Sequence, residues 1–303
     1  MNKRINYQAI LNLTLFLGLL LPPVPSYADH KEGELENNQE TLSIGIFPRR
    51  NISVTRKIFE PLRAFLEVKL NQPVKLHTPK SFSSFWDNVE NKKYDLVHFN
   101  QYHYIISQKK FGYRVILRNK EFGEDTISGA IIVRKDSGIN SVEDLNSKLI
   151  VFGGGRKAMQ SYIIARHLLE DEGLTPNDYR KDFALNPPNA IMAVYYKKAS
   201  AAGVGDKILQ LEMVKNQINT GELKILKKGE QLPQLPWAVN HRLSHRTQTR
   251  IQTMLSNMHQ TTEGKAVLKA AKLDQFVKTI DSDYNEHRII IQDVLDESYL
   301  PQQ

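Results

Sequence analysis

Apolar residues recur with two different periods along the first part of the chain, from Leu42 to residue 126. The stretch "LSIGIF" (Leu42–Phe47) alternates as a β-strand does, and the next segment repeats apolar residues every three or four positions, as a helix does. Ser53 or Thr55 is expected to cap this helix. Strand-like stretches ("PVKLHT", "YDLVHF", "RVILR") are then separated by helix-like ones ("FSSFWDNVENKK", "QYHYIISQKKF"). This alternation predicts a parallel α/β sheet.

The same pattern starts again after "EFGEDT". Strands are predicted at "SGAIIVRKDS", "LIVF", "ASAAGVGD", "LKILKKG" and "PWAVNHR", and helices at "NSVEDLNSK", "MQSYIIARHLLEDEG" and "NAIMAVYYKK". The last 60 residues are expected to be mostly helical, with a polar break at "TIDSDYN". The pattern therefore predicts two α/β units followed by a helical tail.

The N-terminal 28 residues have the three-part order of a secretory signal. Lys3 and Arg4 precede the apolar run "AILNLTLFLGLLL", and small residues, Ser26 and Ala28, stand at positions −3 and −1 of a cleavage site. The apolar run is too short for a mature transmembrane helix, although an uncleaved anchor is the alternative. We expect cleavage after Ala28, a flexible, charged leader at residues 29–41, and export to the periplasm.

Composition narrows the possible functions. The chain has no cysteine, which excludes disulfides, a thiol nucleophile and Cys-ligated metals. Its net charge is +8, and removing Lys3 and Arg4 leaves +6, which suits an anionic ligand. No basic block with interleaved aromatic residues indicates nucleic-acid binding. His98 and His103 do not share a helix face and have no nearby carboxylate pair, so no metal site is expected. No cofactor is expected either.

The order of these segments resembles the phosphate-, phosphite- and phosphonate-type periplasmic solute-binding proteins of bacterial ABC importers. The resemblance rests on "EPLRAFLE", "YDLVHFNQYHYI", "GAIIVRKDSGINSVEDLNSKLIVFGGG" and "AIMAVYYKKASAAGVGD", and it extends over nearly the whole chain from Leu42. It implies a type II periplasmic-binding fold, in which two α/β lobes joined by a hinge close on a ligand. Lobe 1 is expected at residues 42–126, lobe 2 at residues 127–236, and a segment at residues 237–303 is expected to return to lobe 1.

Ligands of open α/β sheets bind beyond the carboxyl ends of strands, where helix N-termini present free N–H groups. Four loops of this sequence have that position. The first two, "FPRRNIS" and "HFNQYHY", and the two later ones, "GGGRKAMQS" and "NPPNAIMAV" with "AAGVGD", supply our candidate ligand-binding residues: Phe47, Arg49, Arg50, Asn100, Gln101, Tyr102, Tyr104, Gly153, Gly154, Gly155, Arg156, Asn189 and Asp206. The arginines are suited to an oxyanion, but they are equally explained as solvated loop charges.

Two of the loops depart from the pattern of the family. Phosphonate-binding members have a Ser/Thr-rich turn where this chain has "GGGRKAMQS", and Ser161 is expected to lie too far inside the helix to replace it. The spacing also differs from that of a nucleotide-binding P-loop. In the fourth loop, Pro187 and Pro188 lack N–H donors, and the histidine of the family is absent. The resemblance therefore predicts the fold more firmly than the ligand.

We expect a monomeric periplasmic solute-binding protein that delivers a small anionic ligand, a phosphonate-like oxyanion or a carboxylate, to the membrane permease of an ABC importer. The alternative is a ligand sensor that signals to a membrane receptor. An enzyme on the same fold is less favoured, because the sequence has no G-x-S-x-G or H-E-x-x-H motif and no carboxylate pair at a strand end. Asp281 and Asp283 are expected to cap a helix.

Overall fold

The computed structural model describes residues 41–300. The predicted signal peptide, and all but the last residue of the predicted leader, lie outside the described residues. None of the helices within residues 41–300 has the length and apolar composition needed to cross a membrane.

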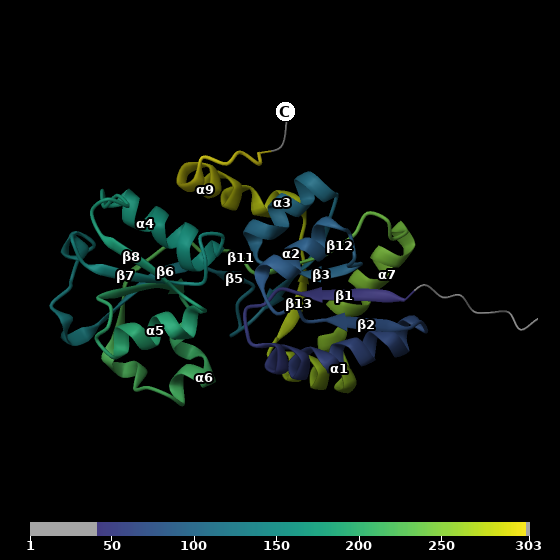
Figure 1. The fold of residues 1–303 in the computed structure, drawn as a ribbon. Coiled ribbons are helices and arrows are strands. Elements are labelled where there is room, and N and C mark those ends of the chain that lie inside the picture. Colours follow the sequence, from purple (N-terminus) through teal and green to yellow (C-terminus); the bar gives the residue numbers. More distant parts are fainter. Residues whose placement is uncertain (1–40, 301–303) are drawn as a thin grey trace, which may run out of the picture. The chain divides into compact units, whose positions relative to one another are not determined.

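A six-stranded sheet forms the centre of what we call lobe 1 (Figure 1). Its strands, in spatial order, are β13 (Gln275–Lys278), β4 (Arg114–Lys120), β12 (Pro236–Val239), β3 (Leu96–His98), β1 (Leu42–Ile46) and β2 (Val74–His77). The strand β1 is parallel to both of its neighbours, and Ile44 pairs with Leu96. The strand β12 is antiparallel to β3 and β4, and β13 is antiparallel to β4.

A five-stranded sheet forms the centre of lobe 2. Its strands, in spatial order, are β10 (Leu223–Lys228), β6 (Gly129–Arg134), β9 (Ala201–Gly205), β7 (Leu149–Gly153) and β8 (Arg180–Ala184). The strand β7 is parallel to β8 and β9, whereas β6 is antiparallel to β9 and β10. The prediction of parallel sheets is therefore correct for three strands of each lobe and wrong for the others. In lobe 1, β12 joins the sheet only after the chain has passed through lobe 2, and it runs in the opposite direction.

Helices pack on these sheets. Lobe 1 carries α1 (Ile52–Leu70), α2 (Phe82–Glu90), α3 (Gln101–Phe111), α7 (His245–Ser256), η6 (Met258–Gln260), α8 (Thr262–Ala271), η7 (Asp281–Tyr284) and α9 (Asn285–Leu295). The cap of α1 is Asn51, whose Oδ1 accepts a hydrogen bond from the Val54 N–H, and not Ser53 or Thr55 as predicted. Of the pair predicted to cap a helix, Asp283 does so, because its Oδ2 accepts from the Ile280 N–H at the start of η7, whereas the carboxylate of Asp281 accepts from Tyr104 and Arg288 instead.

Lobe 2 carries shorter helical segments, and Figure 1 shows α4 and α5 on opposite faces of its sheet. The segments are η1 (Lys135–Ser137), η2 (Glu143–Leu145), η3 (Met159–Ile164), α4 (Ala165–Asp171), α5 (Pro187–Tyr195), η4 (Ile208–Gln210), α6 (Glu212–Lys215) and η5 (Thr220–Glu222). The helix predicted at "NSVEDLNSK" is the single 3₁₀ turn η2. The segment η3 is a π-helix that continues directly into α4.

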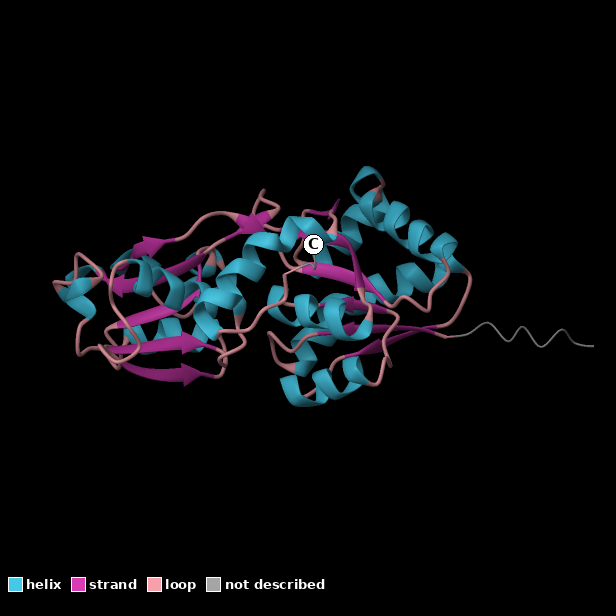
Figure 2. Ribbon diagram, turned by 90° about the horizontal axis from the view of Figure 1, so that it is seen from above, coloured by secondary structure: helices cyan, strands magenta, loops and turns pink. Residues whose placement is uncertain are grey.

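A short antiparallel pair lies along the two chain segments that run between the sheets. It consists of β5 (Thr126–Ile127) and β11 (Leu232–Pro233), with Ile127 opposite Leu232. Figure 2 shows the two groups of strands and the segments that connect them. The lobe boundaries at residues 126 and 236 stay predictions.

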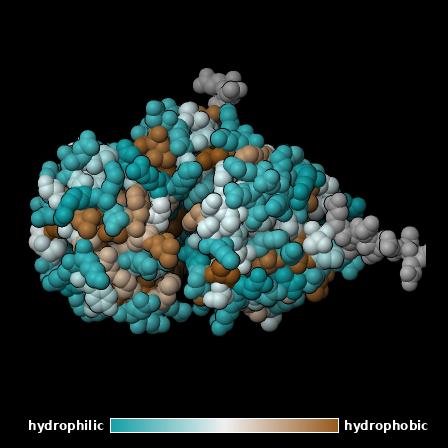
Figure 3. All heavy atoms as spheres, viewed as in Figure 1, coloured by the Kyte–Doolittle hydropathy of each residue, from teal (hydrophilic) through white to brown (hydrophobic). Residues whose placement is uncertain are grey.

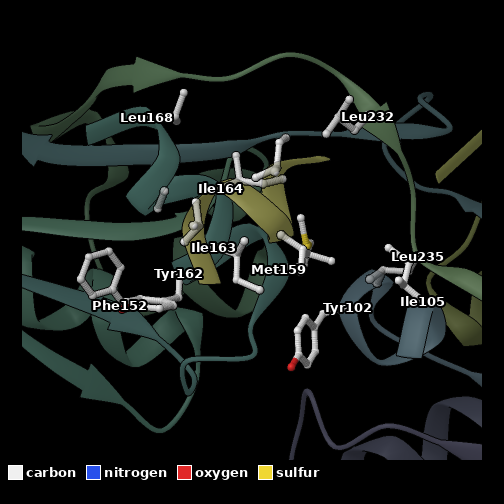
Figure 4. Packing of buried hydrophobic residues seen from close by; sticks show 14 of the residues in the cluster. Tyr102, Ile105, Phe152, Met159, Tyr162, Ile163, Ile164, Leu168, Leu232 and Leu235 are labelled. Atoms are coloured by element: carbon white, nitrogen blue, oxygen red, sulfur yellow. The ribbon is translucent and has the colours of Figure 1, made fainter. Parts of the chain in front are cut away.

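Buried apolar side chains form three clusters, and one of them includes residues of both lobes. In Figure 4, Met159 of η3 lies between Ile163 of lobe 2 and the side chains of Tyr102 and Ile105 of lobe 1, with Leu235 beside them. Residues of α9 belong to the same cluster, and α9 contacts α3 of lobe 1 and both η3 and α4 of lobe 2. The return of the C-terminal segment to lobe 1 stays a prediction, and its last helix, α9, packs against helices of both lobes.

Candidate functional site

A cavity of about 160 Å³ lies between the two lobes, at the carboxyl ends of β1, β7 and β9. Segments from both sheets surround it, and Figure 3 shows hydrophobic side chains beside the hollow between the lobes. Of the predicted residues, seven line the cavity: Phe47, Arg49, Arg50, Asn100, Gln101, Gly153 and Gly154. Strand ends from two lobes thus meet at one site, as the α/β rule predicts.

The loop after β1 brings two arginines to this cavity. A guanidinium nitrogen of Arg49 lies 3.3 Å from Oε1 of the buried Glu121, and Asn119 donates a hydrogen bond of 2.8 Å to the same oxygen. Phe47 supplies an apolar wall and contacts the His98 ring edge-on, with 5.1 Å between the ring centroids. The charge of Arg49 is therefore largely matched by Glu121.

Arg50 differs from Arg49 because its guanidinium has no hydrogen-bond or ion-pair partner among the described residues. The side chain is partly buried where the chain enters α1. Burial, together with the neighbouring Arg49 cation, lowers the pKa of Arg50 to about 9, and Glu121 offsets this only in part. An anion bound beside Arg50 would stabilise its charged form.

The N-terminus of α3 contributes Asn100 and Gln101. The Oδ1 of Asn100 caps the helix by accepting from the His103 N–H at 2.8 Å, and its Nδ2 donates to the Lys157 carbonyl of lobe 2 at 3.2 Å. Burial, with a contribution from Lys157, lowers the pKa of His103 to about 3, so the ring is neutral and its Nδ1–H donates to Asn100 Oδ1. Asn100 therefore connects the two lobes beside the cavity.

Gln101 is fully buried and lies in the cavity wall. Its Nε2 donates a hydrogen bond to the Pro233 carbonyl at 3.1 Å, which fixes the orientation of the amide. The Oε1 atom has no hydrogen-bond partner. A buried carbonyl oxygen without a partner costs free energy that a ligand donor would recover.

The two predicted tyrosines do not line the cavity. The hydroxyl of Tyr102 donates to Glu297 at 2.7 Å, and its ring lies 5.9 Å from Lys157 Nζ. The hydroxyl of Tyr104 donates to Asp281 in the interior of lobe 1. Both rings form part of the buried core instead.

The glycine turn after β7 divides between two hollows. Gly153 and Gly154 line the cavity, whereas Gly155 and Arg156 line an adjacent hollow with Phe82, His103, Lys157 and Ala158. A Cβ on Gly153 would lie 2.4 Å from the Pro187 Cα, and Gly154 has a φ of +104°. The backbone of β7 therefore approaches α5 at a distance that only glycine permits.

The helix after this turn contributes residues that the sequence did not predict. It begins at Met159, so Ser161 lies in its first turn and lines the cavity, and the expectation that Ser161 is too far inside the helix is wrong. Gln160 also lines the cavity, and neither amide atom of its buried side chain has a partner. A π-helix often marks a functional site. In the sequence, the only signal for a site in this segment is the polar Gln160 next to the apolar Met159.

The fourth loop reaches the cavity through the residues before and at the start of α5. Asn186, Pro187 and Pro188 line it, whereas Asn189 is exposed and its N–H donates to Asn186 Oδ1 at 3.0 Å. The Ala190 N–H donates to the Asn186 carbonyl. Because both prolines lack an N–H, the first turn of α5 has no free backbone N–H for a ligand.

Asp206 is buried outside the cavity lining. It accepts hydrogen bonds from the Ser128 N–H at 3.2 Å and the Gln231 Nε2 at 3.0 Å, and Lys228 Nζ lies 3.0 Å from its Oδ2. These contacts join three segments near the connection between the lobes. Both carboxylate oxygens of Asp206 therefore have partners, and neither is free to contact a ligand in this conformation.

The cavity has further lining residues that sequence reasoning missed: Pro48, Phe82, Glu121, Phe122, Ile127, Ala158, Leu185, Gly205, Lys207, Ile208, Leu211, Met213, Gln234 and Leu235. Most of them are apolar, and they stand in loops, short helical segments and strand ends, where a search for polar chemistry does not select them. Within residues 41–300, no group of three or more His, Cys, Asp or Glu side chains has the arrangement of a metal site.

Solved structures with the same fold are numerous. A binding protein component of an ABC phosphonate transporter from Pseudomonas aeruginosa is 17% identical, with a TM-score of 0.72, over 84% of this chain and 86% of that chain. PhnD1 from Prochlorococcus marinus, solved in complex with methylphosphonate, is 16% identical, with a TM-score of 0.74, over 84% of this chain and 98% of that chain. At such identities the likeness establishes the type II periplasmic-binding fold.

A match to a family model covers residues 44–284, and the family is described as the ABC transporter, phosphonate, periplasmic substrate-binding protein. The match includes both sheets and every loop that lines the cavity. Because it extends over well more than half of the sequence, the chain belongs to this family of substrate-binding proteins.

Proposed function

We propose that this protein captures a phosphonate in the cavity between its lobes and delivers it to the membrane permease of an ABC importer. The observation that carries the proposal is the unpaired guanidinium of Arg50 in the cavity wall of a member of this family. Two arginines and one glutamate, Glu121, line the loop side of the cavity, and this leaves an excess positive charge. A phosphonate oxyanion matches that excess, and guanidinium groups bind such oxyanions in a bidentate manner.

Further donors come from both lobes. Gln101 is the first residue of α3, so its backbone N–H belongs to the helix start, where the helix dipole favours an anion. Gln160 of lobe 2 also lines the cavity, and its buried amide has a donor and an acceptor without partners. We propose that the ligand head is held by Arg50 and these two glutamines.

Delivery to a transporter requires that the bound and free forms differ. We propose that lobe 2, residues 127–236, moves against lobe 1, residues 42–126 with 237–303, about the two segments that contain β5 and β11. Residues from both lobes line the cavity, so closure on a ligand brings the two walls together. We propose that the protein acts as a monomer in the periplasm and docks on the permease in the closed form.

Calorimetric titration of the purified protein with methylphosphonate, phenylphosphonate and inorganic phosphate tests this function. We expect binding of at least one phosphonate, and we expect Arg50→Gln to weaken it at least tenfold, because a hydrogen bond to a charged group contributes about 1.5–3 kcal/mol. The matched control is Arg56→Gln, which removes the same charge from an exposed position of α1 outside the cavity. No binding of any phosphonate, or equal losses in the two variants, would contradict the proposal.

A further inference from the structure

The walls of the cavity are unusually apolar for a site that binds only a small oxyanion. Apolar lining residues come from both lobes and include Phe47, Phe82, Phe122, Leu185 and Met213. Leu185 is 85% exposed, Met213 47% and Phe122 42%. Large apolar side chains this exposed at the rim of one cavity indicate a binding surface.

The acidic side chain that lines the cavity already has an ion-pair partner. Glu121 is the only carboxylate among the described lining residues. It is buried, it pairs with Arg49, and it accepts a hydrogen bond from Asn119. An ammonium group in the cavity would meet the cations of Arg49 and Arg50 and would find no free carboxylate, so its desolvation would not be compensated.

In contrast to the paired carboxylate, two amide side chains of the cavity wall have polar atoms without hydrogen-bond partners. Gln101 Oε1 is an acceptor without a donor, and Gln160 offers an unpartnered acceptor and an unpartnered donor. Both side chains are at least nine-tenths buried and line the cavity. A singly protonated phosphonate provides both an O–H donor and oxyanion acceptors. The amides of Gln101 and Gln160, together with the Arg50 guanidinium, therefore match the hydrogen-bonding groups of the phosphonate head.

From these contacts we infer that the ligand is a phosphonate with an apolar organic group of about the size of a phenyl ring, and that the site selects against aminoalkylphosphonates. The inference rests on the proposed function and specifies its substrate class. The apolar group would cover Leu185, Met213 and Phe122, while the head would occupy the side of Arg50, Gln101 and Gln160.

Titration calorimetry with three phosphonates tests the inference: methylphosphonate, 2-aminoethylphosphonate and phenylphosphonate. Burial of the additional carbons predicts that phenylphosphonate binds about tenfold more tightly than methylphosphonate, or more. 2-Aminoethylphosphonate is expected to bind more weakly than methylphosphonate. Equal affinities for the methyl and phenyl compounds, or tightest binding of the amino compound, would overturn the inference and leave the proposed function in place. If none of the three binds, the proposed function itself fails.

Variants of the apolar rim test whether the organic group of the ligand contacts Leu185 and Met213. Leu185→Ser and Met213→Ser are each expected to reduce the affinity for phenylphosphonate severalfold and to change that for methylphosphonate less than twofold. The matched controls are Val68→Ser on α1 and Ile225→Ser on β10, which are 70% and 42% exposed and lie outside the cavity. Equal effects of rim and control substitutions on phenylphosphonate binding would remove the organic group from this wall.

Discussion

The side-chain amide of Asn100, at the start of α3 in lobe 1, donates a hydrogen bond of 3.2 Å to the carbonyl of Lys157 in the glycine turn of lobe 2. The other atom of the same amide, Oδ1, caps α3 by accepting from the His103 N–H. One residue therefore starts a helix in one lobe and contacts the other lobe at the edge of the cavity. The relative position of the lobes and the local structure of α3 are energetically linked through this side chain.

Replacing Asn100 by alanine tests that link. The substitution removes the cap of α3, which costs about 1 kcal/mol, and it also removes the hydrogen bonds to the Lys157 carbonyl and from the His103 ring, which contribute about 1 kcal/mol each. We expect a loss of about 3 kcal/mol in the free energy of unfolding, measured by urea denaturation. Asn51→Ala is the control, because Asn51 caps α1 in the same way and is exposed. Equal losses in the two variants would show that the contact between the lobes contributes nothing.

Gln160 is expected to behave in the opposite way to an ordinary buried glutamine. Its amide has no partner, so Gln160→Met, which keeps the side-chain volume nearly constant, should raise the free energy of unfolding by about 1 kcal/mol. The same variant should bind phosphonate less tightly, because the ligand loses both amide contacts. Gln248 is equally buried, and its Nε2 donates to the Leu243 carbonyl at 2.8 Å. Gln248→Met should therefore destabilise the protein. A loss of stability in both variants would mean that the Gln160 amide is satisfied in solution.

The contact between β7 and α5 depends on Gly153. A Cβ at this position would lie 2.4 Å from the Pro187 Cα, and backbone atoms cannot move away as a flexible side chain can. Gly153→Ala is expected to cost about 1–3 kcal/mol of stability, as overpacking does. It should also weaken ligand binding, because both residues line the cavity. Gly155→Ala is the control: a Cβ there has no atom within 4 Å, and we expect a change within about 0.5 kcal/mol. Similar thermal midpoints for the two variants would contradict the close approach.

The sequence predicted the fold better than it predicted the site. Strands such as "LIVF" and helices such as "QYHYIISQKKF" were predicted correctly from their apolar content and length, although both are buried on more than one face: residues 150–153 of β7 and the first seven residues of α3 are all buried. The strand β8 was missed because "RKDFA" is an edge strand with three exposed polar residues. The strand β13 was missed because only Phe276 of its four residues is buried.

The predicted loops did reach the cavity, since strand order determines which loop ends meet. Side-chain direction within a loop has no such sequence signal. Arg50 lines the cavity whereas Arg156 turns to the neighbouring hollow, and Tyr102 is directed into the core. The apolar rim, with Leu185 in a loop and Met213 in the four-residue helix α6, was missed because single apolar residues in such segments have no distinctive pattern until the opposite wall is known.

Stability at acidic pH is expected to depend on the buried histidine His287 of α9. Neither ring nitrogen has a hydrogen-bond partner, and burial, with the neighbouring Arg288 cation, lowers the pKa of His287 to about 3. The unfolded chain has a histidine pKa of about 6.5, so between about pH 6.5 and pH 3 the unfolded state binds a proton that the folded state does not. The stabilisation is therefore complete above pH 6.5 and is lost as the pH falls toward 3.

This contribution amounts to about 1.4 kcal/mol at pH 5.5 relative to pH 7.5. The variant His287→Leu, which cannot take up the proton, should lose less stability than the wild type by this amount when urea denaturation at the two pH values is compared. The pKa of His103 is also lowered to about 3 by burial. Because His103 is present in the wild type and in His287→Leu, its contribution to the pH dependence of the free energy of unfolding should be similar in both. The control His245→Leu changes an exposed residue at the start of α7 and should leave the wild-type difference unchanged. If His287→Leu shows the full wild-type loss, the His287 ring either takes up its proton in the folded protein or has a partner in solution.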